Sequence, residues 1–77
     1  MTQTAAQRAA IAVTVNGDER LIPAGRTLGD LLREHDLDPR MVVVERNREI
    51  LRERETFNRL VLEHGDVLEI VHFVGGG

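Results

Sequence analysis

Apolar and polar residues alternate along residues 11–15, which predicts a strand with one apolar face. The dipeptide Asn16-Gly17 follows. It is a strong hairpin signal, because a type I′ turn needs positive φ at both central residues. We therefore expect a returning strand over residues 18–22, ended by the Pro-Ala-Gly sequence at 23–25.

The apolar spacing then changes to that of a helix. The residues at positions i, i+3, i+4 and i+7 of the predicted helical face are Leu28, Leu31, Leu32 and His35. Thr27 can cap the first turn, and Asp30 three residues later makes a variant of the capping box. The polar segment 36–38 and Pro39 predict the end of this helix, which would cross over between two strands.

The second half of the chain predicts further strands. Residues 41–44 form a continuous, mostly β-branched apolar run, as in a well-buried central strand. Residues 67–74 are predicted to form the last strand. Between these strands we expect a polar turn at 45–48, a short edge strand at 49–52, a helical turn near 55–60 and a turn at Gly65-Asp66.

This order of elements predicts an α+β fold with a mixed sheet of four to five strands packed on one main helix. The first and last strands would lie side by side and parallel in the middle of the sheet, which is the β-grasp (ubiquitin-like) arrangement. Residues 1–10 lack a periodic pattern and are predicted to form a flexible N-terminal arm. Residues 11–77 would form the single domain, with a flexible glycine tail at 75–77.

Composition excludes several classes of function. A net charge of −3 argues against a nucleic-acid partner. No apolar run approaches the length of a membrane span, and the N-terminal segment lacks the shape of a signal peptide, so we expect a cytoplasmic protein. The chain contains no cysteine, and all ten basic residues are arginine. A covalently carried group would therefore not be attached to a side-chain thiol or amine.

The three terminal glycines, Gly75, Gly76 and Gly77, follow directly on the predicted last strand. A segment without Cβ atoms can enter a slot that is too narrow for other residues. Glycine is entropically costly to hold in one conformation, so it makes a poor structural terminus. These residues suggest that the α-carboxylate of Gly77 is the group that the protein presents.

The order of elements, with His64-Gly65-Asp66 and the run from Val67 to Gly77, resembles the ubiquitin-like sulfur carrier proteins. Within that group the chain is most similar to the ThiS family, a similarity that extends over residues 11–77 and includes Val44-Glu45-Arg46-Asn47. The third glycine, Gly75, exceeds the family's minimum of two.

The resemblance implies a carrier, not an enzyme. A ThiF-like adenylating enzyme would use ATP and Mg²⁺ to convert the Gly77 carboxylate into an acyl-adenylate. Sulfur from a donor protein would then give a thiocarboxylate, and a ThiG-like thiazole synthase would receive the sulfur for thiamine biosynthesis. The carrier itself would bind no cofactor and would be a monomer when free.

Two alternatives remain open: a carrier that serves molybdopterin synthesis or another pathway, and a β-grasp interaction module whose glycines carry no chemistry.

Alternation along the last strand predicts where partners dock. If Leu68 and Ile70 face the helix, then Val71 and Phe73 lie on the outer face near the tail. We expect Val71, Phe73 and Val74 to form the partner-docking patch.

The remaining polar residues give no catalytic or metal-binding pattern. His35, His64 and His72 are spread through the chain without the spacing of metal ligands, so we expect surface histidines and no metal site. The arginines of the segment 46–54 are interleaved with glutamates, which is typical of a solvated face. We predict no catalytic residue in this chain.

Overall fold

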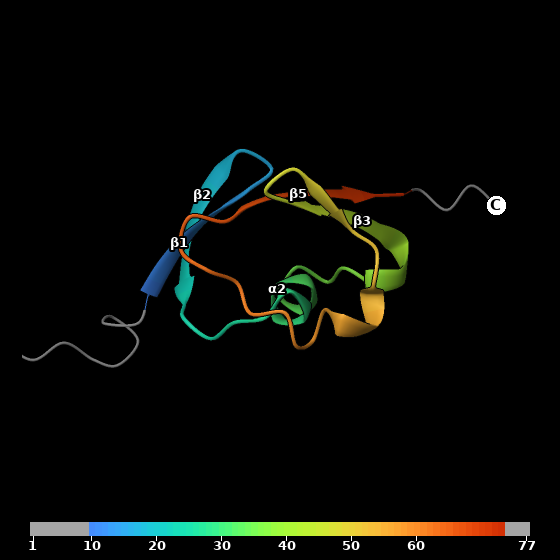
Figure 1. Cartoon of the computed structure of the whole chain (residues 1–77), viewed down its shortest axis with the longest axis horizontal. Coiled ribbons are helices and arrows are strands. Elements are labelled where there is room, and N and C mark those ends of the chain that lie inside the picture. The colour runs from blue at the N-terminus through green and yellow to red at the C-terminus, as the bar shows by residue number, and fades with distance from the viewer. Residues whose placement is uncertain (1–9, 74–77) are drawn as a thin grey trace, which may run out of the picture.

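The computed structural model describes residues 10–73. These residues form a five-stranded mixed sheet that is covered on one side by a helix (Figure 1). The strands are β1 (Ala10–Val15), β2 (Asp18–Pro23), β3 (Val42–Arg46), β4 (Glu49–Leu51) and β5 (Val67–His72). The helix is α2 (Leu28–Glu34), and two short 3₁₀ helices are η1 (Pro39–Met41) and η2 (Arg54–Thr56).

The strands are arranged in the order β2-β1-β5-β3-β4, so the last strand lies at the centre of the sheet. β5 pairs in parallel with β1 and antiparallel with β3. The edges are formed by β2, antiparallel to β1, and by the short β4, antiparallel to β3. The predicted β-grasp arrangement, with adjacent and parallel first and last strands, is confirmed.

Local signals in the first half of the chain were accurate. Asn16 and Gly17 have φ values of 50° and 88°, as a type I′ turn requires. The Thr27 side chain accepts a hydrogen bond from Asp30 N–H, while the Asp30 side chain accepts one from Thr27 N–H, so the capping box is complete. His35, the last residue of the predicted helical face, is the C-cap and is exposed, as expected for a surface histidine.

The core lies between the sheet and α2. Its buried apolar side chains are Val13, Val15, Ile22, Leu28, Leu31, Leu32, Val42, Val44, Phe57, Leu62 and Leu68. Val42 and Val44 are fully buried whereas Val43 between them is half-buried. The 41–44 run thus contributes an interior, well-buried strand, as expected: β3 lies between β5 and β4 and is buried mainly on the helix face.

The turn predicted at 45–48 is shorter than expected. Glu45 and Arg46 belong to β3, and only Asn47 and Arg48 form the turn to β4. Both have positive φ, 51° and 74°, although neither is glycine. A 3₁₀ helix at Arg54–Thr56 overlaps the start of the helical turn expected near 55–60. β5 ends at His72, before the predicted end of the strand at residue 74.

Gly29 sits where α2 meets the segment that follows η2. Its N–H donates to Phe57 O at 2.9 Å. A Cβ at this position would press on the Asn58 carboxamide and lie 3.1 Å from the Asn58 Cα. The helix and the loop therefore approach each other more closely than alanine would allow.

We expect Gly29→Ala to destabilise the fold by about 1–3 kcal/mol, because overpacking outweighs the usual helix-propensity gain of about 1 kcal/mol. Urea unfolding followed by circular dichroism measures this change. In a double-mutant cycle, Asn58→Ala should recover part of the loss by removing the carboxamide that the new methyl meets. A G29A variant that is more stable than wild type would contradict the close approach.

Candidate functional site

The C-terminal end of β5 is the candidate site, because the described chain leaves the sheet there on its way to Gly77 (Figure 1). Three anchors hold β5 in place, one at each end and one in the middle. Val74 and the glycines Gly75, Gly76 and Gly77 lie outside the described residues, as does the predicted arm up to residue 9. Their predicted roles therefore stay predictions.

The first anchor is Asp66, the buried carboxylate immediately before β5. It is only 5% exposed. Its oxygens accept hydrogen bonds from Arg46 Nε at 3.0 Å, Asn47 Nδ2 at 3.0 Å and Glu63 N–H at 2.8 Å. Asp66 thus ties the turn before β5 to the hairpin between β3 and β4.

The electrostatics of Asp66 follow from this geometry. Burial raises the pKa of its carboxyl, but the hydrogen bonds from the Glu63 backbone, Arg46 and Asn47, together with the Arg46 charge, outweigh burial. The net result is a pKa below the ordinary value of 3.8. The ionised form is therefore the one that the fold stabilises.

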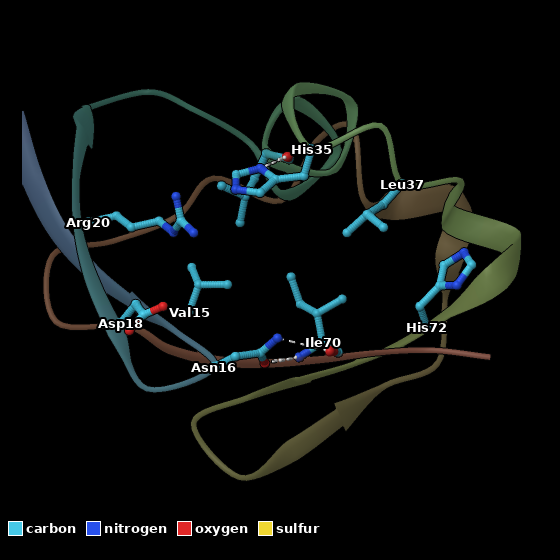
Figure 2. A pocket seen from close by; sticks show the side chains of 9 residues that line it. Val15, Asn16, Asp18, Arg20, His35, Leu37, Ile70 and His72 are labelled. Atoms are coloured by element: carbon cyan, nitrogen blue, oxygen red, sulfur yellow. Dashed lines mark hydrogen bonds between the residues drawn. The ribbon is translucent and has the colours of Figure 1, made fainter. Parts of the chain in front are cut away.

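The second anchor is the side chain of Asn16, the first residue of the hairpin turn. Its Oδ1 accepts from Ile70 N–H at 2.7 Å, and its Nδ2 donates to Ile70 O at 3.1 Å (Figure 2). Its backbone N–H donates to Leu68 O at 2.9 Å. The carboxamide therefore extends the β1–β5 ladder beyond the last backbone pair, Val15 with Leu68.

The third anchor is at the end of β5, where Phe73 N–H donates to Met41 O at 2.9 Å. Around it, apolar side chains appear on the outer face of the sheet. Val71 is 61% exposed and Phe73 39% exposed, whereas Leu68 on the helix side is fully buried. The predicted facing of these side chains is confirmed; their docking role stays a prediction.

Two neighbouring side chains extend this surface. Val43 is the register partner of Val71, and Ile50, 50% exposed, lines a hollow together with Val43. We call Val43, Ile50, Val71 and Phe73 the outer-face patch. Glu69 and Glu45, also paired across the strands, border it.

The arginines of the segment 46–54 are not all solvated, contrary to expectation. The Arg46 side chain is 20% exposed and forms an ion pair of 2.8 Å with Asp66. Arg54 is exposed, yet it also has a structural role, because it donates to Pro39 O at 3.0 Å and to Val42 O at 3.2 Å. Sequence reasoning missed both roles, because their partners lie 12 to 20 residues away in the chain.

The three histidines lie apart. His64 Nδ1 accepts from Ala12 N–H at 3.0 Å, His35 Nδ1 is 3.0 Å from Leu31 O, and His72 lies near the end of β5. Within residues 10–73, no three histidine or carboxylate side chains are grouped so that they could hold a metal ion.

Comparison with known proteins identifies the family. The model of the ThiS family matches residues 6–77. The chain belongs to the ThiS family. The resemblance to this family inferred from the sequence is therefore confirmed.

Individual relatives agree. The sulfur carrier protein ThiS of Bacillus subtilis is 49% identical over 51 residues, which are 66% of this chain and 76% of that protein. A thiazole synthase of Paramagnetospirillum magneticum is 43% identical over 65 residues, 84% of this chain. Those residues are only 20% of that enzyme, so this chain spans about a fifth of its length.

The fold comparison gives the same family. The crystal structure of the thiamine biosynthesis protein ThiS from Geobacter metallireducens superposes with a TM-score of 0.68 at 30% identity. The match covers 87% of this chain and 100% of that one. In the part of this ThiS-family chain that is described, no helix has the length and apolarity to cross a bilayer.

Removing the charge of Asp66 should loosen the start of β5. We expect Asp66→Asn to lower the free energy of unfolding by about 1–3 kcal/mol at pH 7, because Arg46 loses its buried ionic partner. Urea unfolding monitored by circular dichroism gives the value.

The pH dependence supplies the control. Because the folded pKa of Asp66 is depressed, its contribution is complete above about 3.8, the ordinary value, and is lost as the pH falls through the folded pKa. The stability difference between wild type and D66N should therefore shrink below about pH 4. A difference that is constant from pH 7 to pH 3 would contradict the assigned role.

Proposed function

We propose that this chain is the sulfur carrier of thiazole formation in thiamine biosynthesis, and that Gly77 is the residue that carries sulfur. The observation that carries the proposal is the family match over residues 6–77, which includes the glycine tail. The Bacillus subtilis relative, itself a sulfur carrier protein ThiS, supports it.

The chemistry begins with a carboxylate. An α-carboxyl with a pKa of about 3.5 is ionised at neutral pH and is a poor electrophile. A partner enzyme would let a Gly77 oxygen attack the α-phosphorus of ATP, with pyrophosphate leaving and Mg²⁺ bound in the partner's site. Sulfur from a donor would then attack the acyl carbon and expel AMP. If the donor is a persulfide, this gives an acyl disulfide, and attack of a thiol on the donor's sulfur would release the Gly77 thiocarboxylate and leave a disulfide on the donor.

The described residues would contribute presentation, not catalysis. Asp66, Asn16 and Met41 fix the path of β5 up to Phe73. The segment after Phe73 would then be delivered from a fixed point on the folded body. We accordingly propose a protein that is not an enzyme itself and works in the cytoplasm.

Two classes of partner follow. A ThiF-like enzyme would form the adenylate, and a thiazole synthase would consume the thiocarboxylate. The second is supported by the thiazole synthase of Paramagnetospirillum magneticum, which contains a segment similar to this chain. Such a relative favours thiazole formation over molybdopterin synthesis as the destination of the sulfur.

The carrier function predicts a change in mass. Incubation with the adenylating enzyme, ATP, Mg²⁺ and a sulfur source should raise the intact mass by about 16 Da, as sulfur replaces oxygen. Electrospray mass spectrometry of the whole chain measures it. Deletion of Gly77 should abolish both adenylation and the mass gain.

The alternative interaction module makes the opposite prediction. A chain that binds its partner normally but never gains mass, alongside a Bacillus subtilis ThiS control that does, would overturn the carrier function. If the chain lacking Gly77 still binds its partner, the carrier function is not overturned, because docking and chemistry involve different residues.

The outer-face patch predicts which substitutions impair docking. Val71→Arg should raise the KM for adenylation of the carrier at least about tenfold, because it places a charge in an apolar contact next to the tail. Leu21→Arg is the matched control: Leu21 is 76% exposed, and its register partner in β1 is Ala12, away from the end of β5. Pyrophosphate-exchange kinetics with the carrier as the varied substrate distinguish the two variants. Equal KM values for V71R and wild type would exclude the patch as the docking surface.

A further inference from the structure

A cavity of about 280 Å³ lies on the helix side of the sheet, beside the end of β5 (Figure 2). Its apolar lining comes from Val15, Leu31, Leu37 and Ile70. Polar side chains surround this lining: Asn16 from the hairpin turn, Asp18 and Arg20 from β2, His35 from the end of α2 and His72 from β5. The outer-face patch is on the opposite face of the sheet, so the cavity is a separate feature.

The backbone of His72 lies at the same place. In an antiparallel pair, residues alternate between bonding across to the partner strand and pointing away from it. Phe73 N–H bonds to Met41 O, so the N–H and C=O of the preceding residue, His72, point away from β3. Val42, opposite His72, behaves accordingly: its C=O accepts from Arg54 on the side away from β5.

On the other side of β5, the ladder with β1 has already ended. The last backbone bond on this side comes from the turn residue Asn16, whose N–H donates to Leu68 O, and its carboxamide bonds both the N–H and the C=O of Ile70. Unlike Leu68 and Ile70, His72 has no hydrogen bond to its N–H or C=O from this side among residues 10–73. His72 is thus the first residue of β5 whose edge is open, and it opens beside the cavity.

We propose that a partner that takes up the tail adds an extended segment to this open edge, pairing with the backbone of His72 and inserting an apolar side chain into the cavity. This inference rests on the proposed carrier function. A carrier's tail that enters an enzyme leaves water, and its backbone groups then need hydrogen-bond partners. An added strand supplies these hydrogen-bond partners, and the N–H and C=O of His72 would make the first hydrogen bonds of the new ladder.

The lining specifies the chemistry of the inserted segment. The cavity has the volume and the apolar lining to take one large aliphatic or aromatic side chain. Asp18 also lines the cavity, but Arg20 forms no ion pair with it or with any other described residue, so the Arg20 guanidinium is available to a carboxylate next to that side chain. Since Leu31 O can only accept, His35 Nδ1 donates to it, and its Nε2 is left for the cavity. The partner segment would thus be extended, with an apolar residue beside an acidic one.

His72→Pro tests the backbone pairing. Proline removes the N–H, yet within β5 this N–H bonds neither β3 nor β1, so the fold should persist. We expect kcat/KM for adenylation by the ThiF-like enzyme to fall about five- to tenfold. His72→Ala keeps the N–H, so its kcat/KM should fall less.

Arg20→Glu tests the charged side of the cavity. We expect it to lower kcat/KM for adenylation about fivefold or more. Arg59→Glu is the charge-matched control, because Arg59 is exposed in the loop after η2.

Amide hydrogen exchange of the wild-type chain gives a readout that no substitution can disturb. Adding the ThiF-like enzyme should slow the exchange of the His72 amide at least about tenfold, while the Phe73 amide, already bonded to Met41, serves as the internal reference. Unchanged His72 exchange in a complex that adenylates Gly77 would overturn the strand addition and leave the carrier function standing. A wild-type chain that is never adenylated would overturn the carrier function, and this inference with it.

Discussion

The parallel pairing of β1 with β5 is the constraint on which the rest of the structure depends. It joins segments that are some fifty residues apart through Thr14 N–H to Asp66 O, Asn16 N–H to Leu68 O and Gly65 N–H to Ala12 O. The pairing puts the last strand at the centre of the sheet and turns Leu68 into the core against α2. A parallel pair needs a long connection, and α2 with β3 and β4 provides it while covering one face and completing the sheet.

The same pairing is short, and its shortness defines the site. Backbone bonds from β1 and the turn residue Asn16 reach only as far as Leu68, and the Asn16 carboxamide adds Ile70. Beyond that point β5 is supported by β3 alone, up to Phe73. The strand is thus held on both sides where it forms the core and on one side where it approaches the tail. One interaction gives the end of β5 a fixed path and also leaves it an open edge.

Sequence was a good guide wherever a local signal carries the structure. Asn16-Gly17 predicted the hairpin and Thr27 with Asp30 the start of the helix, because turn geometry and capping involve residues close in the chain. It was a poor guide to the Asn47-Arg48 turn, whose positive φ values carry no glycine signature.

Asp66 shows why long-range polar anchors were missed. Its role depends on Arg46 and Asn47, which only the folded sheet brings near it. Asn16 shows the same contrast within one residue. Its turn depends on the adjacent Gly17 and is predicted by the sequence, whereas its carboxamide bonds Ile70, which is far away in the chain, so the sequence gives no sign of that second role.

The length of the tail limits how an enzyme can recognise the proposed carrier. Four residues follow Phe73, and even a fully extended chain of four spans no more than about 14 Å. Any enzyme that acts on Gly77 must therefore bring its reacting groups within about that distance of the end of β5. Its walls would then lie close to the side chains and backbone around His72 and Phe73. For the proposed carrier, a short tail therefore favours recognition by the folded body, because residues 74–77 alone span too little distance to keep an enzyme away from it.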